Sequence, residues 1–447
     1  MGLTHVATCA APEQLARLVR GWSGDLTLVL RDAGVDFASA AFQLQQDALQ
    51  MLVLDHWRLS VPRTADPAAL PAALQHVVVF AAPPLDPWLA VLPASVQPVA
   101  IHTFEPAAKL ATVPTACPSL CRLTLQATKA ARLPEFVGPL TRLATLGLRG
   151  CTALTALPQT LGQLTALTTL TLHGCMALSS LPESIGQLTS LRTLILVDCP
   201  TLTCLPEPVG RLAALVTLEL RVCQMLQRLP ESIGQLAALA KLYLFACPSV
   251  TCVPESVGRL PVLKMLHLER LPSLTLLPDS IGQLVALTAM TMCSCTTLAT
   301  LPDSIGQLVA LATLHLRGCT SLTCLPESIG QLSALNTLDL SICPSLTRLP
   351  ESIGRLPSLT ELRLDSCESL AQLPESIGQL ATLNSLMMDS CDALTCLPES
   401  IGQLTALTTL TLRWCTELTR LPHSLGQLAA LTSLDLLSCA QLSVLPD

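Results

Sequence analysis

Aromatic side chains are scarce in this sequence of 447 residues: Phe, Trp and Tyr make up 2% of it, although half of the chain is hydrophobic. This balance excludes a core built on aromatic packing and indicates Leu and Ala packed in layers. A run of about 18 consecutive apolar residues is also missing, which excludes an α-helix that spans a bilayer.

A surplus of positive charge is missing as well, because the formal net charge is −7. A protein that binds nucleic acid needs a basic stripe, so the sequence argues against nucleic acid as the main partner. Lysine is particularly rare among the 25 basic residues, and the rest are Arg. Either a G+C-rich genome or selection against ubiquitin attachment inside a host cell accounts for this bias. The lysines are Lys109, Lys129, Lys241 and Lys264.

Signatures of catalysis are absent too. The sequence holds no P-loop, no dinucleotide-binding glycine pattern and no HExxH zinc motif. Ser recurs at position 4 of the repeat described below, which indicates repetition rather than a nucleophile held beside a base. We therefore expect no catalytic residue and no cofactor.

The sequence does contain one unit of 24 residues many times over. Leu-Pro pairs, once replaced by Val-Pro, begin at residue 133 and recur every 24 residues up to residue 445 without an insertion. Counted from this Leu or Val, apolar residues occupy repeat positions 1, 5, 8, 11, 14, 16 and 22, Gly occupies position 6 and Cys position 19. Such a fixed period indicates a solenoid in which each repeat buries its apolar face against its neighbours.

Each repeat predicts one strand and one turn. Positions 14 to 16 alternate, as in Leu410-Thr411-Leu412, and predict a short strand whose leucines point inward. Position 2 is Pro and position 3 an acidic residue, which together favour a first helical turn. The predicted fold class is α/β: a curved solenoid with a parallel β-sheet on the concave face and short 3₁₀ or α turns on the convex face.

The pattern LxxLxLxxCxxLxxLPxxIGxL resembles the plant-type leucine-rich repeat. It is similar to the repeats of plant intracellular disease-resistance receptors and of the leucine-rich effectors that plant-pathogenic bacteria inject into host cells. The resemblance covers residues 133–447. It implies a horseshoe-shaped scaffold that binds another protein, without saying which one.

Twelve of the twenty cysteines occupy position 19, from Cys151 to Cys439. This spacing indicates a ladder of single thiols rather than disulfide pairs, with side chains that can satisfy backbone groups where the chain leaves the strand. Reduced structural thiols indicate a reducing compartment. Four further cysteines share position 24, namely Cys204, Cys252, Cys324 and Cys396.

Three regions follow from the spacing. Residues 1–48 predict a helical cap, with helical periodicity over 13–22 and 40–50 separated by a possible strand and turn. Residues 49–132 contain irregular, shorter repeats, so we expect the sheet to begin well before residue 133. Residues 133–447 contain thirteen complete repeats and the start of another. Because no C-terminal cap is visible, either the natural protein continues or the last strand is an open edge.

Positions 13, 15 and 17 should point out of the concave sheet, and many hold Thr or Ser. The departures cluster in neighbouring repeats, where Glu219 and Arg270 accompany a set rich in aromatic, Met and cationic residues, the types that interface centres favour. The predicted partner-binding residues of this first cluster are Arg221, Lys241, Tyr243, Phe245, Lys264, Met265, His267 and Glu269.

A second candidate cluster is mostly acidic and suggests a basic partner segment. Its residues are Asp339, Glu361, Arg363, Asp365 and Asp389, with Arg413 beside them. A metal site is a further candidate, because His267 and His315 share position 15 two repeats apart, with Cys293 between them. Roughly 10 Å should separate the two histidines, whereas zinc usually takes four close ligands, so we expect no metal.

The sequence therefore predicts a non-catalytic scaffold that binds a protein on its concave face, as an effector or an immune-type recognition module. The alternative is the substrate-recognition part of a ubiquitin ligase system whose catalytic domain is absent or recruited. The expected location is the cytoplasm, with translocation into a host cell if the protein is an effector, since no secretory signal is visible. The oligomeric state stays open.

Overall fold

The computed structural model describes residues 120–126, 130–133 and 135–443, and by their backbone alone residues 5–9, 26–31, 49–57, 76–81 and 99–103. It divides into two compact units, residues 1–202 and 203–447. No helix in the described part of the chain is long and apolar enough to cross a membrane.

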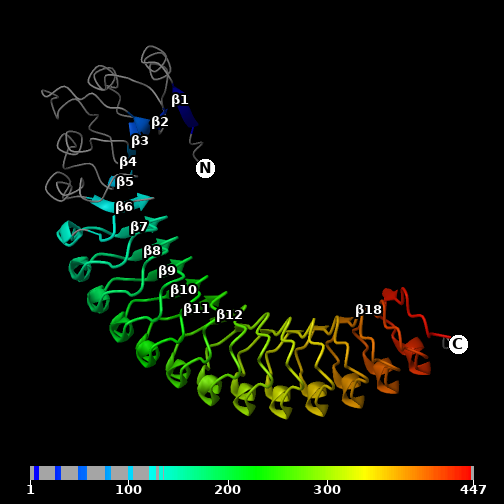
Figure 1. The fold of residues 1–447 in the computed structure, drawn as a ribbon. Coiled ribbons are helices and arrows are strands. Elements are labelled where there is room, and N and C mark those ends of the chain that lie inside the picture. The colour runs from blue at the N-terminus through cyan, green and yellow to red at the C-terminus, as the bar shows by residue number, and fades with distance from the viewer. Residues whose placement is uncertain are drawn as a thin grey trace, which may run out of the picture. The chain divides into compact units, whose positions relative to one another are not determined.

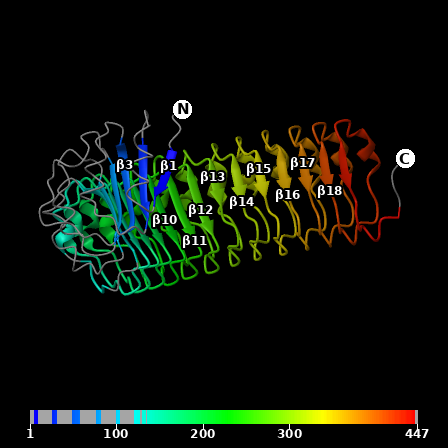
Figure 2. The ribbon, with the colours of Figure 1, turned by 90° about the horizontal axis from the view of Figure 1, so that it is seen from above.

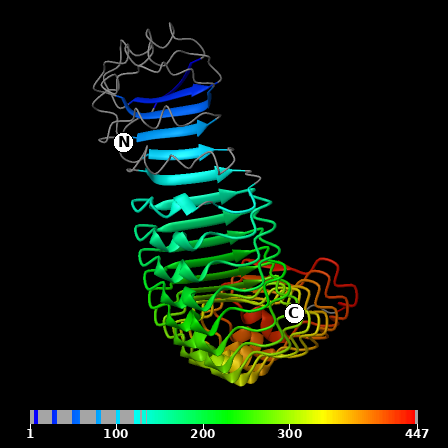
Figure 3. The ribbon, with the colours of Figure 1, turned by 60° about the vertical axis from the view of Figure 1, so that its left-hand side comes forward.

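The first unit is a stack of parallel strands, each paired with the next (Figure 3). Its described strands are β1 (His5–Cys9), β2 (Leu26–Arg31), β3 (Leu49–Trp57), β4 (His76–Ala81), β5 (Val99–Thr103), β6 (Leu120–Gln126), β7 (Thr145–Arg149), β8 (Thr169–His173) and β9 (Thr193–Val197). The 3₁₀ helices are η3 (Glu135–Val137), η4 (Gln159–Gln163) and η5 (Glu183–Gln187).

Strands β1 and β2 lie within residues 1–48, for which the sequence predicts a helical cap, and they pair in parallel. The expected helices over 13–22 and 40–50 fall outside the described residues, except that residues 49 and 50 already belong to β3. The cap therefore stays a prediction. Register shifts interrupt the pairing of β2 with β3, β3 with β4 and β5 with β6, whereas β6 to β9 pair without them.

In the second unit strands and 3₁₀ helices alternate, and the strands pair in parallel with a constant offset of one repeat. Its strands are β10 (Thr217–Arg221), β11 (Lys241–Phe245), β12 (Met265–Glu269), β13 (Ala289–Thr291), β14 (Thr313–His315), β15 (Thr337–Asp339), β16 (Glu361–Arg363), β17 (Ser385–Met387), β18 (Thr409–Thr411) and β19 (Ser433–Asp435). Its helices are η6 (Glu207–Arg211), η7 (Glu231–Gln235), η8 (Glu255–Arg259), η9 (Asp279–Gln283), η10 (Asp303–Gln307), η11 (Glu327–Gln331), η12 (Glu351–Arg355), η13 (Glu375–Gln379), η14 (Glu399–Gln403) and η15 (His423–Gln427).

Within this unit the strands line the inner side of a curved stack and the 3₁₀ helices its outer side (Figure 1), and the strands run side by side when seen from above (Figure 2). The solenoid with a concave parallel sheet and convex short turns, predicted from the sequence, is confirmed. The turns are 3₁₀ rather than α helices, of five residues each. Such tight helices suit a connection that has to turn within a few residues.

The apolar positions of the repeat form the core. In the repeat that begins at Leu325, all the predicted apolar positions and Cys343 are at most 4% exposed. Leucines of neighbouring strands meet in register, as Leu314, Leu338 and Leu362 do. Each layer therefore packs between two similar layers, and burying each fully covered leucine stabilises the fold by roughly 1.5–3 kcal/mol.

The glycine at position 6 is required by the close approach of successive turns. A Cβ added to Gly330 would clash with the carbonyl oxygen of Ser352 and lie 2.8 Å from the Cβ of that serine. Ser352 is the second residue of η12, the next turn, and its small side chain is buried. The Gly and Ser of the repeat therefore set how closely the outer turns can stack.

Replacing Gly330 by Ala should lower the free energy of unfolding by about 1–3 kcal/mol, because the added methyl group has to push two turns apart. Gly426 is the matched control, since it holds the same repeat position but a Cβ added there would meet nothing within 4 Å. Urea denaturation of both variants measures the difference. Equal, small effects at the two positions would show that turn stacking does not need the glycine.

The acidic residue at position 3 links one repeat to the next. The Glu327 carboxylate accepts a hydrogen bond from the backbone N–H of Ser352 at 3.1 Å, and Glu399 accepts one from Ser424 at 3.2 Å. These amides lie in the first turn of helices that have no side-chain cap of their own. The Ser424 N–H also lowers the pKa of Glu399. The repeated acidic residue therefore caps the following turn.

The cysteines of position 19 are buried donors. Cys343 donates its S–H to the carbonyl of Leu316 at 3.4 Å, and Cys367 donates to that of Leu340 at 3.3 Å. Both carbonyls belong to position 16 of the preceding repeat, just beyond the three-residue strands. The thiols thus donate to backbone carbonyls that lie beyond the hydrogen-bonded strands. The cysteines of the described residues form no disulfide bond.

The buried thiols should resist alkylation in the native protein. Burial raises the pKa of Cys295 and of Cys343 to about 12, so little thiolate is present at neutral pH. Iodoacetamide should modify the exposed Cys204 and Cys252 but few thiols of position 19, and nearly all of them after denaturation. Peptide mass spectrometry measures this pattern, and disulfide-linked peptides would contradict a ladder of reduced thiols.

Candidate functional site

Strands β10, β11 and β12 present three side-chain columns on the inner face of the second unit. Their leucines at positions 14 and 16 are buried, so positions 13, 15 and 17 face outward, as predicted. The register places Tyr243 opposite Glu219 and His267, and Phe245 opposite Arg221 and Glu269. The first cluster predicted from the sequence is therefore brought together as one contiguous surface.

Tyr243 is the centre of this surface. Its ring lies 5.7 Å from the His267 ring, at an interplanar angle of 51°. Its hydroxyl donates to the sulfur of Met265 at 3.7 Å. His267 in turn places Nε2 2.9 Å from a carboxylate oxygen of Glu269. Each of these side chains thus holds its neighbour in place, which lowers the entropy lost when a partner binds.

Phe245 contacts two guanidinium groups. The Cζ atom of Arg221 lies 5.8 Å from the centre of the Phe245 ring, and that of Arg270 lies 5.2 Å from it. Arg221 also forms an ion pair with Glu219, in which Nε lies 2.5 Å from a carboxylate oxygen. The Nε atom of Arg270 lies 4.0 Å from a carboxylate oxygen of Glu269. These cation–π contacts and ion pairs orient both arginines at the same end of the strands.

The two lysines lie at the opposite end of the strands. Lys241 begins β11, and Lys264 directly precedes β12; both are exposed. Among the described residues neither has a carboxylate within ion-pair distance. We call the whole set the aromatic patch: Glu219, Arg221, Lys241, Tyr243, Phe245, Lys264, Met265, His267, Glu269 and Arg270.

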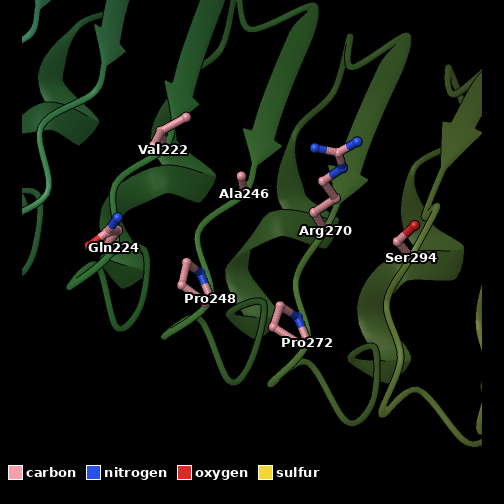
Figure 4. Close-up of a pocket in the computed structure, with 7 residues that line it drawn as sticks. All are labelled: Val222, Gln224, Ala246, Pro248, Arg270, Pro272 and Ser294. Carbon is pink, nitrogen blue, oxygen red and sulfur yellow. The ribbon is translucent and has the colours of Figure 1, made fainter.

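An open pocket of about 440 Å³ adjoins the arginine end of the aromatic patch (Figure 4). Its lining repeats every 24 residues, because it uses positions 18 and 20 of successive repeats. Position 18 adopts a left-handed backbone, with φ between 51° and 58° at Val222, Ala246, Arg270 and Ser294. The remaining lining residues are Gln224, Pro248 and Pro272. The sequence reasoning missed this pocket, although Gly150, Gly174 and Gly318 at position 18 signal the left-handed turn.

In the second cluster, most aspartates accept hydrogen bonds from backbone N–H groups of the same cluster or its neighbours. Asp339, expected on the exposed face, is only 8% exposed and accepts a hydrogen bond from the Ser341 N–H at 2.9 Å. Asp365 accepts from the N–H of Asp389 at 3.1 Å, and Asp389 accepts from that of Arg413 at 2.9 Å. Burial raises the pKa of Asp365. These three carboxylates therefore accept backbone N–H groups just beyond the ends of the strands. Asp339 in particular exposes little surface that a partner could contact.

The short strands explain this use of aspartate. In β15 to β18 the strands end at position 15, so the amide of position 17 lies outside the strand. In the repeats of β15, β17 and β18 this amide donates to a carboxylate. Glu361 and Arg363 pair with each other at 2.6 Å and stay partly exposed. The second cluster thus offers fewer free charges than its composition suggests.

No group of three or more His, Cys, Asp or Glu side chains in the described residues is arranged to hold a metal ion. His267, a candidate ligand by its repeat position, instead contacts Tyr243 and Glu269. His315 lies on β14, two strands away.

Comparison with known proteins agrees with the fold. A family described as "Leucine-rich repeat region" matches residues 279–372. A leucine-rich repeat protein of Leptospira interrogans superimposes with a TM-score of 0.65 at 25% identity, over 96% of this chain and 99% of that one. Toll, in its complex with Spätzle from Drosophila, gives a TM-score of 0.57 at 15% identity, over 96% of this chain and 60% of that one. No curated protein matches the sequence. The resemblance to leucine-rich repeats is thereby confirmed, and the chain is a leucine-rich repeat solenoid.

Proposed function

We propose that this leucine-rich repeat solenoid is a protein-binding scaffold that holds its partner on the aromatic patch. One observation carries the proposal: the chain's single tyrosine, a Phe and a Met lie together on the inner face, oriented by ring contacts and ion pairs. In the repeat of β18, by contrast, positions 13 and 15 hold Thr409 and Thr411. Aromatic, Met and Arg side chains are those that dominate the energy of protein interfaces.

The scaffold itself supports protein binding. Repeat solenoids bind through their extended concave surfaces, because these present many side chains on a rigid backbone. The Toll structure of the same fold is a complex with Spätzle. The role that fits both the scaffold and the sequence resemblance is that of an effector or an immune-type recognition module, without catalysis. The free thiols support a reducing compartment such as the cytoplasm.

The experiment is affinity capture with three baits from extracts of candidate host cells. The baits are the parent chain, the patch variant Tyr243→Ser with Phe245→Ser, and the control Thr409→Ala with Thr411→Ala. The proposal expects one protein to be retained by the parent and the control, and lost from the patch variant. A protein retained equally by all three baits would place binding elsewhere on the chain.

A further inference from the structure

The aromatic patch differs in charge from the rest of the chain. It contains four cationic side chains and two carboxylates, whereas the whole chain has a formal net charge of −7. Glu219 and Glu269 are already engaged, with Arg221 and with His267 respectively. With four cationic side chains against two carboxylates, the patch therefore has an excess of positive charge, in a chain whose overall charge is negative.

These positive charges lie at two ends of the patch. Lys241 and Lys264 mark the beginning of the strands, and Arg221 and Arg270 their end. Positions 13 and 17 are four residues apart, which is roughly 13 Å in a strand. An extended peptide advances by about 3.3–3.6 Å per residue, so it spans the same distance in about four residues.

Apolar surface lies between and beyond the two cationic ends. Tyr243 occupies the middle, and its hydroxyl contacts the sulfur of Met265, the first residue of β12, which is 36% exposed. Past the arginine end, the pocket offers the walls of Val222, Ala246, Pro248 and Pro272 (Figure 4). Arg270 is part of both the aromatic patch and the pocket, because it contacts Phe245 and also lines the pocket. It is 64% exposed, so its guanidinium donors remain open to an incoming carboxylate.

We propose that the partner presents an extended acidic segment to this patch, with carboxylates about four residues apart and an apolar side chain between them. One carboxylate meets Lys241 and Lys264, the other meets Arg270 and Arg221, and the apolar side chain packs on Tyr243 and Met265. A further apolar residue enters the pocket past Arg270. This inference rests on the proposed function and names the chemistry of its partner.

A peptide fits this patch better than a single-stranded nucleic acid does. Stacking of bases needs free aromatic faces, and the Phe245 ring already contacts two guanidinium groups. Glu219 and Glu269 would also repel the evenly spaced charges of a phosphate backbone. A peptide whose carboxylates are about four residues apart can place them away from these two side chains.

The test is selection from a displayed library of random peptides of about twelve residues, panned on the full chain. The selected peptides are then synthesised, and their dissociation constants are measured in about 0.15 M salt. We expect Asp or Glu about four residues apart around an aromatic or aliphatic residue. Lys241→Glu with Lys264→Glu should weaken these peptides at least about tenfold. The control Arg348→Glu with Arg420→Glu makes the same charge change at exposed residues outside the patch and should leave their affinity unchanged.

Three results would overturn the inference: no peptide is enriched, the enriched peptides are basic or uncharged, or an oligouridylate of similar length binds more tightly than they do. If the selection fails while the captured partner still depends on Tyr243 and Phe245, the patch binds a protein by other chemistry. If that dependence is missing as well, the proposed function fails with it.

Discussion

Replacing Leu338 by Gly should lower the free energy of unfolding by about 4 kcal/mol or more. Leu338 is fully buried at position 14 of β15, in register with Leu314 and Leu362. Removing its side chain loses the transfer energy of a buried leucine and leaves a cavity between layers that the neighbouring strands cannot close. In a solenoid each repeat contacts only its neighbours, so the loss weakens both interfaces of this repeat. Urea denaturation followed by circular dichroism measures it.

Leu434 provides the matched control. It holds the same repeat position in β19 and pairs with Leu410, but it is 40% exposed. Leu434→Gly makes the same chemical change with much less buried surface at stake, so we expect its effect to stay below half of that at Leu338. Equal effects at the two positions would mean that backbone freedom, rather than layer packing, accounts for the loss.

The core residues could be predicted from the sequence because the 24-residue period fixes which side chains face inward and which residues they meet. Once positions 14 and 16 are assigned to a strand, the alternation decides which side chains face inward, and a constant offset of 24 residues fixes their partners. For the same reason the aromatic patch was predictable, since Tyr243 and His267 share position 15 of successive repeats. The periodicity thus predicts on which face of the sheet a side chain lies and which residues of the next repeats lie beside it.

Periodicity does not give the hydrogen bonds between repeats. Asp339 and Asp365 look like surface charges by position, yet both accept backbone N–H groups, because the strands there end two residues earlier than β10 to β12 do. The repeat pattern does not encode this difference in strand length. The left-handed turn at position 18 is likewise visible in Gly150 but hidden where Val222 or Ile342 adopts it.

Changing Tyr243 and Phe245 to Ser should weaken partner binding by roughly 2 kcal/mol or more, about 30-fold in the dissociation constant. The patch would lose both rings, and with them the contacts that hold His267, Met265 and the two arginines. The fold should persist, because positions 15 and 17 lie outside the buried leucine layers. Thermal melting of the variant checks this point.

Calorimetric titration of the captured partner against three proteins tests the proposed binding site most directly: the parent, the Tyr243→Ser and Phe245→Ser variant, and the Thr409→Ala and Thr411→Ala control. The aromatic patch predicts parent-like affinity for the control and a loss of roughly 30-fold for the patch variant, with unchanged melting for both. Equal affinity for all three folded proteins would contradict the assignment. Binding that weakened steeply with salt would then direct attention to the partly exposed charges around Glu361.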